Sequence, residues 1–291
     1  MENTKTILKG LISLSTGAAL LGFSAIFVRI SETSPSTTAF YRAFLALPFL
    51  YLWIHFSREA INWNLDRRTI FIFLASGIFF GSDMAVWNWS IQFTSVAHAT
   101  LLANTAPIFV TLIAFTFLKQ TISKSFLFFL LLAMSGVYLV ISSGSGGNEE
   151  RLFGDYLGIA AAVFYAGYIL SIKRLTDQIS PSQVLFFSTL VTALFLFPIS
   201  LIESDSLLPE TSEGWSILFG YALVSQVIGS GLITFGISKL SAHLSSLVLL
   251  IQPVAAAVFG WVILSEDLIS TQIFGGLIVL VAIYLASTRS D

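Results

Sequence analysis

The chain lacks cysteine altogether and is poor in charge. None of its 291 residues is cysteine, so disulfides, thiolate metal sites and cysteine nucleophiles are excluded. Charged residues make up 10% of the chain, against about 25% in soluble domains. No ATP-binding motif is present, and neither His98 nor His243 is followed by a histidine or acid four residues on. We therefore expect no cofactor, no metal site and no nucleic acid partner.

Long apolar runs account for most of what remains, since 56% of the residues are hydrophobic. A helix needs about 20 apolar residues to cross about 30 Å of hydrocarbon. The run at 11–30 is too long for the hydrophobic core of a signal peptide, so we interpret it as part of an uncleaved first span. The ten predicted spans are 9–30, 36–56, 69–93, 95–117, 124–142, 155–172, 181–201, 215–238, 243–263 and 270–287.

The second five spans repeat the first five. Pro107 and Pro253 lie 146 positions apart in corresponding spans, and Pro35 and Pro181 show the same separation. Five spans per half is an odd number, so the halves must enter the membrane in opposite senses, the architecture of many secondary transporters. We therefore predict an all-α membrane protein with ten transmembrane helices arranged as two inverted five-helix repeats.

The two repeats are predicted to meet at a flexible linker, the glycine-rich segment 144–148. This places the first repeat at residues 1–145 and the second at residues 146–291.

The distribution of basic residues predicts the orientation. With the N-terminus in the cytoplasm, only Arg29 and Arg151 fall on the outer side, which satisfies the positive-inside rule. We therefore expect a multi-pass protein of the inner (cytoplasmic) membrane with both termini in the cytoplasm. The basic residues on the cytoplasmic side are Lys5, Lys9, Arg58, Arg67, Arg68, Lys119, Lys124, Lys173, Arg174, Lys239 and Arg289. The acids of one outer loop, which either gather cations or are simply solvated, are Glu203, Asp205, Glu210 and Glu213.

Two stretches resemble a known family. From Phe93 the chain reads FTSVAHATLLANTAPIFVTLI, and from Ser241 it reads SAHLSSLVLLIQPVAAAVFGWVILSEDLIS. Both are similar to the repeated motif of EamA-type transporters in the drug/metabolite transporter superfamily. The glutamate usual in the turn of that motif is Glu266 in the second half. The chain departs from the pattern at Gln120 in the first half, and at Leu21, where the family usually has tryptophan.

The resemblance implies a transporter of small metabolites such as amino acids, other amines or nucleobases. It also implies a central cavity lined by spans 1, 3, 4, 6, 8 and 9, with spans 5 and 10 at the periphery. The expected partners are a small-molecule substrate and the lipid bilayer, with a coupling proton as a further partner in the case that Asp83 takes up a proton.

Two charged residues lie within the predicted spans, Arg42 and Asp83. A charge at the bilayer centre costs about 2.5–3.5 kcal/mol on insertion scales, so neither should face lipid. Both are at similar depth from the outer end of their spans, at about 1.5 Å per residue. They form either a buried ion pair that joins spans 2 and 3, or a functional set. In the second case Arg42 anchors a substrate carboxylate, or Asp83 takes up a proton.

Polar residues precede the two matched prolines. Asn104 and Thr105 precede Pro107, and Gln252 precedes Pro253. Proline leaves a backbone carbonyl unpaired one turn earlier, and such groups are tolerated in a membrane only when buried in protein or facing a wet cavity. These side chains either satisfy the broken turns or line the cavity, and we include all three among the substrate-binding candidates.

Four further residues complete the candidate site. Trp87 is four residues from Asp83 and shares its helix face, where a tryptophan can bind an amine. Gln226 is a mid-span amide, and Tyr165 and Tyr168 share a face of span 6. These residues either bind substrate or pack.

The favoured function is alternating-access transport of a small metabolite, an amino acid or related amine. Pro107 and Pro253 are candidate flex points between the halves. An intramembrane lipid-processing enzyme and a passive solute channel remain alternatives, although the acids, histidines and serines do not cluster at one interface as such an enzyme requires.

Overall fold

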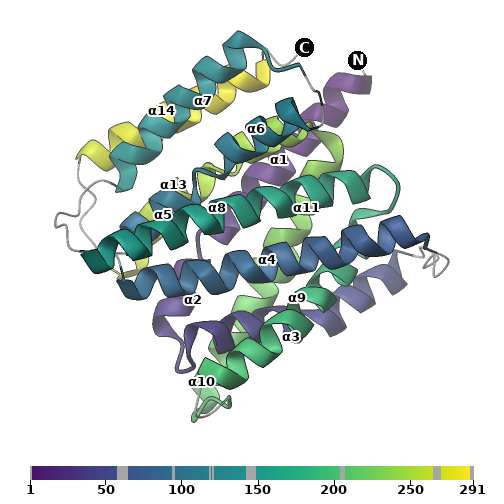
Figure 1. Ribbon diagram of the computed structural model, residues 1–291, viewed down its shortest axis with the longest axis vertical. Helices are drawn as coiled ribbons and strands as arrows, with labels where there is room; N and C mark the ends of the chain where they lie inside the picture. The colour runs from purple at the N-terminus through teal and green to yellow at the C-terminus, as the bar shows by residue number, and fades with distance from the viewer. Residues whose placement is uncertain are drawn as a thin grey trace.

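The chain is helical throughout the residues that its computed structural model describes (Figure 1). These residues are 2–57, 65–93, 96–117, 119, 121–141, 149–203, 207–264 and 270–288. Several sequence predictions lie outside them: the linker 144–148 with the repeat boundary at 145/146, the turn at 94–95, Gln120, Glu266 and Asp205.

Fourteen α-helices and one π-helix are described within these ranges. They are α1 (Glu2–Leu21), α2 (Ser24–Ile30), α3 (Pro35–Phe56), α4 (Arg67–Phe93), α5 (Val96–Ala103), α6 (Ala106–Thr116), α7 (Lys124–Ile141), α8 (Glu149–Thr176), α9 (Pro181–Glu203), α10 (Ser212–Tyr221), η1 (Ala222–Gly229), α11 (Ser230–Lys239), α12 (Ala242–Val248), α13 (Ile251–Leu264) and α14 (Ser270–Thr288).

These helices form the ten predicted spans. The first half consists of α1 with α2, α3, α4, α5 with α6, and α7. The second half consists of α8, α9, α10 with η1 and α11, α12 with α13, and α14. Eight helical segments in the described chain are long and apolar enough to cross a membrane, and two shorter apolar helices, Ala106–Thr116 and Lys124–Val140, belong to spans 4 and 5. The prediction of an all-α membrane protein is confirmed; span 4 is divided into two short helices, and α7 of span 5 ends within one residue of its predicted limit.

The contacts between spans follow a two-fold pattern. A two-fold axis between the halves exchanges span 2 with span 7 and span 5 with span 10, so a contact within either pair maps onto itself. A contact between spans 3 and 6 requires an equivalent contact between spans 8 and 1. The observed pairs α3 with α9, α7 with α14, α4 with α8, and α1 with α11 are these four. The duplication inferred from the prolines therefore extends to the packing.

The α7–α14 pair shows that the halves are inverted. A Cβ atom on Gly136 would lie 2.9 Å from Val279, and a Cβ on Gly275 would lie 2.9 Å from Val140. Along α7 from Gly136 to Val140, the contacts on α14 run backwards from Val279 to Gly275, so the two helices are antiparallel. This pair lies at one edge of the bundle, in agreement with the predicted peripheral position of spans 5 and 10 (Figure 1).

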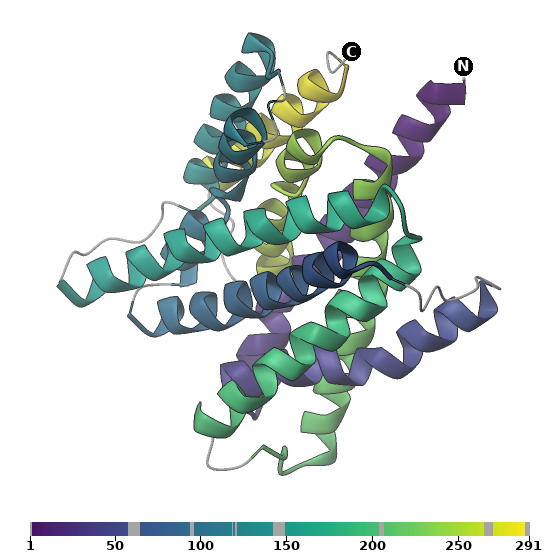
Figure 2. The ribbon, with the colours of Figure 1, turned by 45° about the vertical axis from the view of Figure 1, so that its right-hand side comes forward.

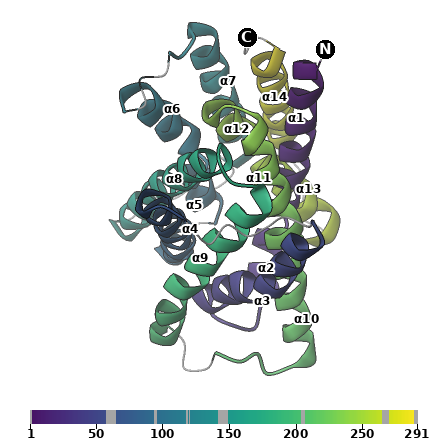
Figure 3. The ribbon, with the colours of Figure 1, turned by 90° about the vertical axis from the view of Figure 1, so that its right-hand side faces the viewer.

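Both termini lie at the same end of the molecule, as an even number of spans requires. Figure 2 and Figure 3 show the two ends of the chain close to each other, with α2, α10 and the start of α3 at the opposite end. We call these the terminal end and the far end.

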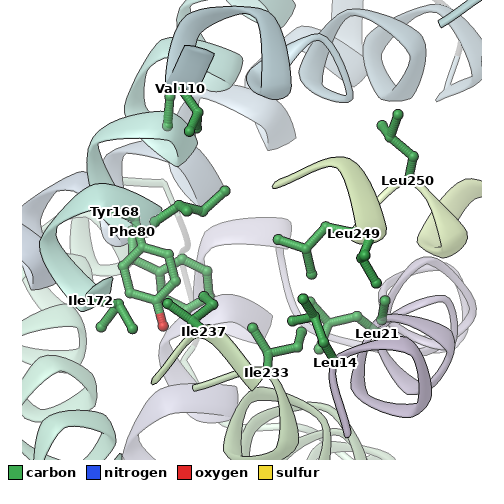
Figure 4. Packing of buried hydrophobic residues seen from close by; sticks show 14 of the residues in the cluster. Leu14, Leu21, Phe80, Val110, Tyr168, Ile172, Ile233, Ile237, Leu249 and Leu250 are labelled. Atoms are coloured by element: carbon green, nitrogen blue, oxygen red, sulfur yellow. The ribbon is translucent and has the colours of Figure 1, made fainter. Parts of the chain in front are cut away.

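Buried apolar side chains from several spans pack together in the bundle (Figure 4), and many of them lie in the parts of their spans nearer the terminal end. Leu14, Val110 and Ile237 come from spans 1, 4 and 8 and have no exposed surface, and Ile172 from span 6 has none either. Leu250, at the break in span 9, is 1% exposed. Tight apolar packing of this kind excludes water, so the terminal half of the bundle is closed.

Candidate functional site

Four spans are irregular near the middle of the bundle. Span 1 breaks at residues 22–23, span 4 at 104–105 and span 9 at 249–250, while span 8 changes from α-helix to π-helix over 222–229. Discontinuous helices frame the substrate sites of many secondary transporters, and π-helical turns are frequent at functional sites. The irregularities therefore mark where a site is to be sought.

A cavity of about 110 Å³ lies among these irregular segments, which is room for several water molecules. Its lining residues on span 1 come from the part nearest the far end, and those on span 2 come from the start of that span. The cavity therefore occupies the half of the bundle opposite the termini. Its polar and aromatic lining side chains are Ser24, Arg42, Phe80, Asp83, Trp87, Asn88, Thr100, Asn104, Tyr165, Tyr221 and Gln252.

The lining agrees with the predicted set of spans, with one correction. Spans 1, 3, 4, 6, 8 and 9 all contribute, as the family resemblance implies, but span 2 contributes Ala39 and Arg42 as well. Span 2 enters because its arginine needs polar partners, which lie across the cavity in span 8.

Arg42 is held by span 8. Its Nε–H donates to the side-chain oxygen of Gln226 at 2.9 Å, and its two terminal nitrogens donate to the hydroxyls of Tyr221 at 3.3 Å and Ser230 at 3.4 Å. The guanidinium carbon also lies 5.2 Å from the centre of the Tyr221 ring and 5.3 Å from that of Phe80. Arg42 is 4% exposed. Hydrogen bonds and aromatic rings thus offset the cost of burying this charge.

The π-helix explains how these partners come together. A π-helical turn hydrogen-bonds residue i to residue i+5, which brings Tyr221 and Gln226 onto the same side of span 8. Ser230 follows the turn and donates its hydroxyl to the carbonyl of Ser225 at 3.1 Å. The Gln226 amide also donates to Thr189 of span 7 at 2.9 Å, so the arginine ties span 2 to two spans of the other half.

Asp83 lies on the cavity wall and does not pair with Arg42. In the described chain no oxygen of Asp83 is within 4 Å of an Arg42 nitrogen, although both side chains line the cavity. The interpretation of these residues as a direct ion pair between spans 2 and 3 is therefore wrong. The physical reason is that span 8 already supplies oxygen acceptors to the guanidinium.

Among the polar side chains near the prolines, Asn104 and Thr105 bond to backbone carbonyls at the break in span 4, and Asn104 and Gln252 line the cavity. The Asn104 side chain donates to the carbonyl of Thr100 at 2.8 Å, and the Thr105 hydroxyl donates to the carbonyl of Leu102 at 2.6 Å. Asn104 and Gln252 line the cavity, whereas Thr105 does not. The sequence left open whether these side chains bond to the broken turns or line the cavity, and Asn104 does both.

Aromatic rings form one wall of the cavity. Trp87 and Tyr165 both line it, from spans 3 and 6. Behind them Tyr168 stacks on Phe80, with ring centres 4.4 Å apart, and also on Tyr165 at 6.0 Å. Tyr168 is 3% exposed and is not part of the lining. It supports the wall from behind.

Six of the nine candidate residues therefore line one cavity, and three do not. Gln226, which is 1% exposed, reaches the site only through Arg42, and Thr105 and Tyr168 lie outside the lining. The sequence reasoning missed Tyr221. Its spacing from Gln226 would have been a signal only if the π-helical turn had been anticipated.

Carboxylates join the two halves at the far end. Glu32 accepts hydrogen bonds from the backbone N–H groups of Glu210 at 3.0 Å and Thr211 at 3.2 Å, and from the Thr211 hydroxyl. The bond from the Thr211 side chain, and then those from the backbone, lower the pKa of Glu32. Glu203 accepts from the Ser36 backbone N–H at 3.1 Å. Two acidic residues of the predicted outer loop thus contact the other half, Glu203 through its carboxylate and Glu210 through its backbone N–H.

These features define a class: a polytopic membrane protein whose two inverted repeats enclose a cavity, the architecture of secondary transporters. The EamA-like transporter family matches residues 8–142 and again residues 152–288. The chain belongs to that family. It is therefore a membrane transporter and not an enzyme, as the sequence predicts.

Similar proteins cover nearly the whole chain. The uncharacterized transporter YetK of Bacillus subtilis (strain 168) is 29% identical over 88% of this chain and 79% of its own length. The pseudopaline exporter CntI of Pseudomonas aeruginosa is 26% identical over 92% and 93%. The riboflavin transporter ImpX of Fusobacterium nucleatum is 23% identical over 95% and 96%. A solved crystal structure with 14% identity superimposes with a TM-score of 0.82 over 99% of both chains, which supports the fold alone.

Proposed function

We propose that this transporter carries a small metabolite with an amino group, an amino acid or related amine, across the inner membrane. The observation that carries the proposal is that the two ionisable side chains of the cavity, Arg42 and Asp83, differ in their hydrogen-bond partners. Arg42 has three hydrogen-bond partners on its own chain. Asp83 has neither a hydrogen bond nor an ion pair with any described residue, so its carboxyl group is the one for which a ligand would supply the direct contacts.

The surroundings of Asp83 suit an organic amine. Trp87 is one helical turn away on the same face, and Tyr165 of span 6 belongs to the same aromatic wall of the cavity. An aromatic ring attracts an ammonium group at its face. Asn104 and Gln252 add amide groups at the broken turns, so a few polar groups converge in an otherwise apolar cavity, as in small-ligand sites generally. In this proposal Arg42, with N–H groups beyond the three already engaged, receives the substrate carboxylate.

Alternating access is the proposed mechanism. The cavity occupies the far half of the bundle while apolar side chains close the terminal half. With both termini in the cytoplasm, as the basic residues predict, this conformation presents the site toward the outer face. Rocking of one half against the other would move access to the cytoplasmic face. Asp83 is also the group at which a coupling proton would exchange with the amine.

The substrate class is proposed from the cavity and not from the relatives, whose names specify solutes as different as pseudopaline and riboflavin. The test is counterflow into proteoliposomes across a panel of amino acids, amines and nucleobases. We expect saturable uptake of an amine-bearing solute, and loss of that uptake in Asp83→Asn. The matched control is Asp177→Asn, which removes an acid at the end of α8, far from the cavity.

Three results would overturn the proposal. Flux that never saturates would indicate a channel. Uptake confined to solutes without an amino group would remove the assigned substrate class. Normal uptake by Asp83→Asn would remove Asp83 from the site.

A further inference from the structure

A second pocket lies between spans 3 and 6 at the terminal end of the bundle. Its volume is about 120 Å³, and it is lined by Asp66, Arg68, Thr69, Ile72, Arg174, Leu175, Gln178 and Ile179. It is separate from the central cavity, with which it shares no lining residue.

Two arginines from different halves of the protein meet in this pocket. Arg68 is in the first turn of α4, and Arg174 is in the last turn of α8. Neither forms an ion pair with a described carboxylate. By contrast Lys173, which precedes Arg174 in the chain, forms an ion pair with Asp177 at 3.1 Å. Two guanidinium groups without carboxylate partners suit an anion with several oxygens, because each guanidinium can donate two parallel hydrogen bonds.

The one acid in the pocket is already engaged. Asp66 accepts a hydrogen bond from the backbone N–H of Thr69 at 3.2 Å. Hydrogen bonds from Thr69, first from its side chain and then from the backbone, lower the pKa of the Asp66 carboxyl. This carboxylate is therefore directed at the start of α4, and the net charge of the pocket stays positive.

The surface beside the pocket is apolar. On α8 the exposed side chains Tyr156, Ile159 and Val163 form one face, and this face begins about 16 Å along the helix from Arg174, within the length of an acyl chain. On α4 the exposed side chains Phe71 and Leu74 lie one to two turns from Arg68. A ligand with a phosphate group in the pocket could therefore lay apolar chains along the membrane-facing surface.

We propose that this pocket binds a phosphate group, and that an anionic phospholipid supplies it. Basic pockets between transmembrane helices at the cytoplasmic side bind acidic lipid headgroups in other membrane proteins. The lipid would bridge span 3 of one half and span 6 of the other. This proposal does not depend on which solute the central cavity carries.

The test measures lipid binding to the full-length protein in neutral detergent. Phosphatidylglycerol, phosphatidylcholine and soluble glycerol 3-phosphate are each titrated while retained lipid is counted by native mass spectrometry and the melting temperature is followed. We expect phosphatidylglycerol to be retained and to raise the melting temperature, and the other two to do neither at matched concentration. The double variant Arg68→Gln/Arg174→Gln should bind phosphatidylglycerol at least tenfold more weakly.

A matched control distinguishes lipid binding in the pocket from a general attraction between the lipid and positive charge on the protein surface. Arg67→Gln/Lys173→Gln removes the same two positive charges from the adjacent positions, neither of which lines the pocket. Equal binding by wild type and both double variants would overturn the proposal, as would equal loss in both variants. If glycerol 3-phosphate binds as tightly as the lipid and competes with it, the site is one for a soluble phosphate and the lipid assignment is wrong. Because all four side chains lie at the surface or nearly so, the variants should fold, and size-exclusion chromatography checks this.

Discussion

Arg42 of span 2 donates its Nε–H to the Gln226 side chain of span 8, 184 residues later, at 2.9 Å. This bond joins the two halves at the wall of the central cavity. It also fixes the Arg42 guanidinium on neutral partners of span 8, which leaves the Asp83 carboxyl without a hydrogen bond or ion pair to a described residue.

Replacing Gln226 tests how much this junction contributes to stability. Gln226→Leu keeps the approximate volume but leaves a buried N–H of Arg42 and the Thr189 hydroxyl without their partner. An unsatisfied buried polar group costs about 1–3 kcal/mol, and more when the group is charged. We expect a clear fall in the melting temperature of the purified protein. The control is Ser135→Leu, at an exposed position of α7, which should melt within a degree or two of wild type.

The aromatic wall can be tested with a pair of tryptophans on the same helix. Trp87 lines the cavity, whereas Trp89 is 43% exposed on another face of α4. Loss of a cation–π contact of about 1–2 kcal/mol should raise the KM for an amine substrate by roughly 5- to 30-fold in Trp87→Ala. Trp89→Ala should change KM less than twofold. An unchanged KM in a folded Trp87→Ala protein would show that this ring does not contact the substrate.

The peripheral helix pair offers a change that should affect stability alone. A Cβ on Gly275 would lie 2.5 Å from the carbonyl oxygen of Gly136, whereas a Cβ on Gly276 would lie 3.1 Å from a methyl group of Val254. Backbone cannot move aside as a side chain can, so Gly275→Ala should destabilise the protein by about 1–3 kcal/mol, with KM unchanged. Gly276→Ala is the control and should be tolerated. Equal melting temperatures for the two variants would contradict the close approach of α7 and α14.

Acidification should weaken the contact between Glu32 and Thr211. Hydrogen bonds from the Thr211 hydroxyl and backbone hold the pKa of Glu32 below its ordinary value. A carboxyl with a lowered pKa stabilises the fold when ionised, so its contribution is present at neutral pH and is lost as pH falls from about 5 to below 4. The measurement is the melting temperature against pH for wild type, Glu32→Gln and the control Glu213→Gln. Wild type should melt above Glu32→Gln at pH 7, and the gap should close on acidification; a gap that persists at pH 3 would assign the effect to something other than ionisation.

The sequence predicted the helical spans and their internal repeat well, because both follow from patterns that extend over many residues. Long apolar runs and matched prolines do not require knowledge of helix register. The position of Asn104 and Gln252 in the cavity also followed, since proline breaks a helix wherever it lies inside one. The partners of Arg42 did not follow, because depth estimates assume straight α-helices and span 8 contains a π-helical turn. That turn rotates Tyr221 and Gln226 relative to the rest of the span. The π-helix could not be predicted from residues 222–229, because they include no proline and no charged residue.

The amides beside the two prolines allow a direct test of where the cavity lies. Because the chain has no cysteine, Asn104→Cys and Gln252→Cys each introduce a single thiol into the cavity lining. The cavity occupies the half of the bundle away from the termini, so both thiols should react with a membrane-impermeant reagent added from that side. Saturating substrate, at ten times its dissociation constant, should slow the reaction about tenfold. Thr111→Cys, at a position that is 6% exposed and outside the lining, should stay unreactive. If both cavity thiols are as inert as the Thr111→Cys control in a protein that still transports, the amides are buried packing and the substrate site lies elsewhere.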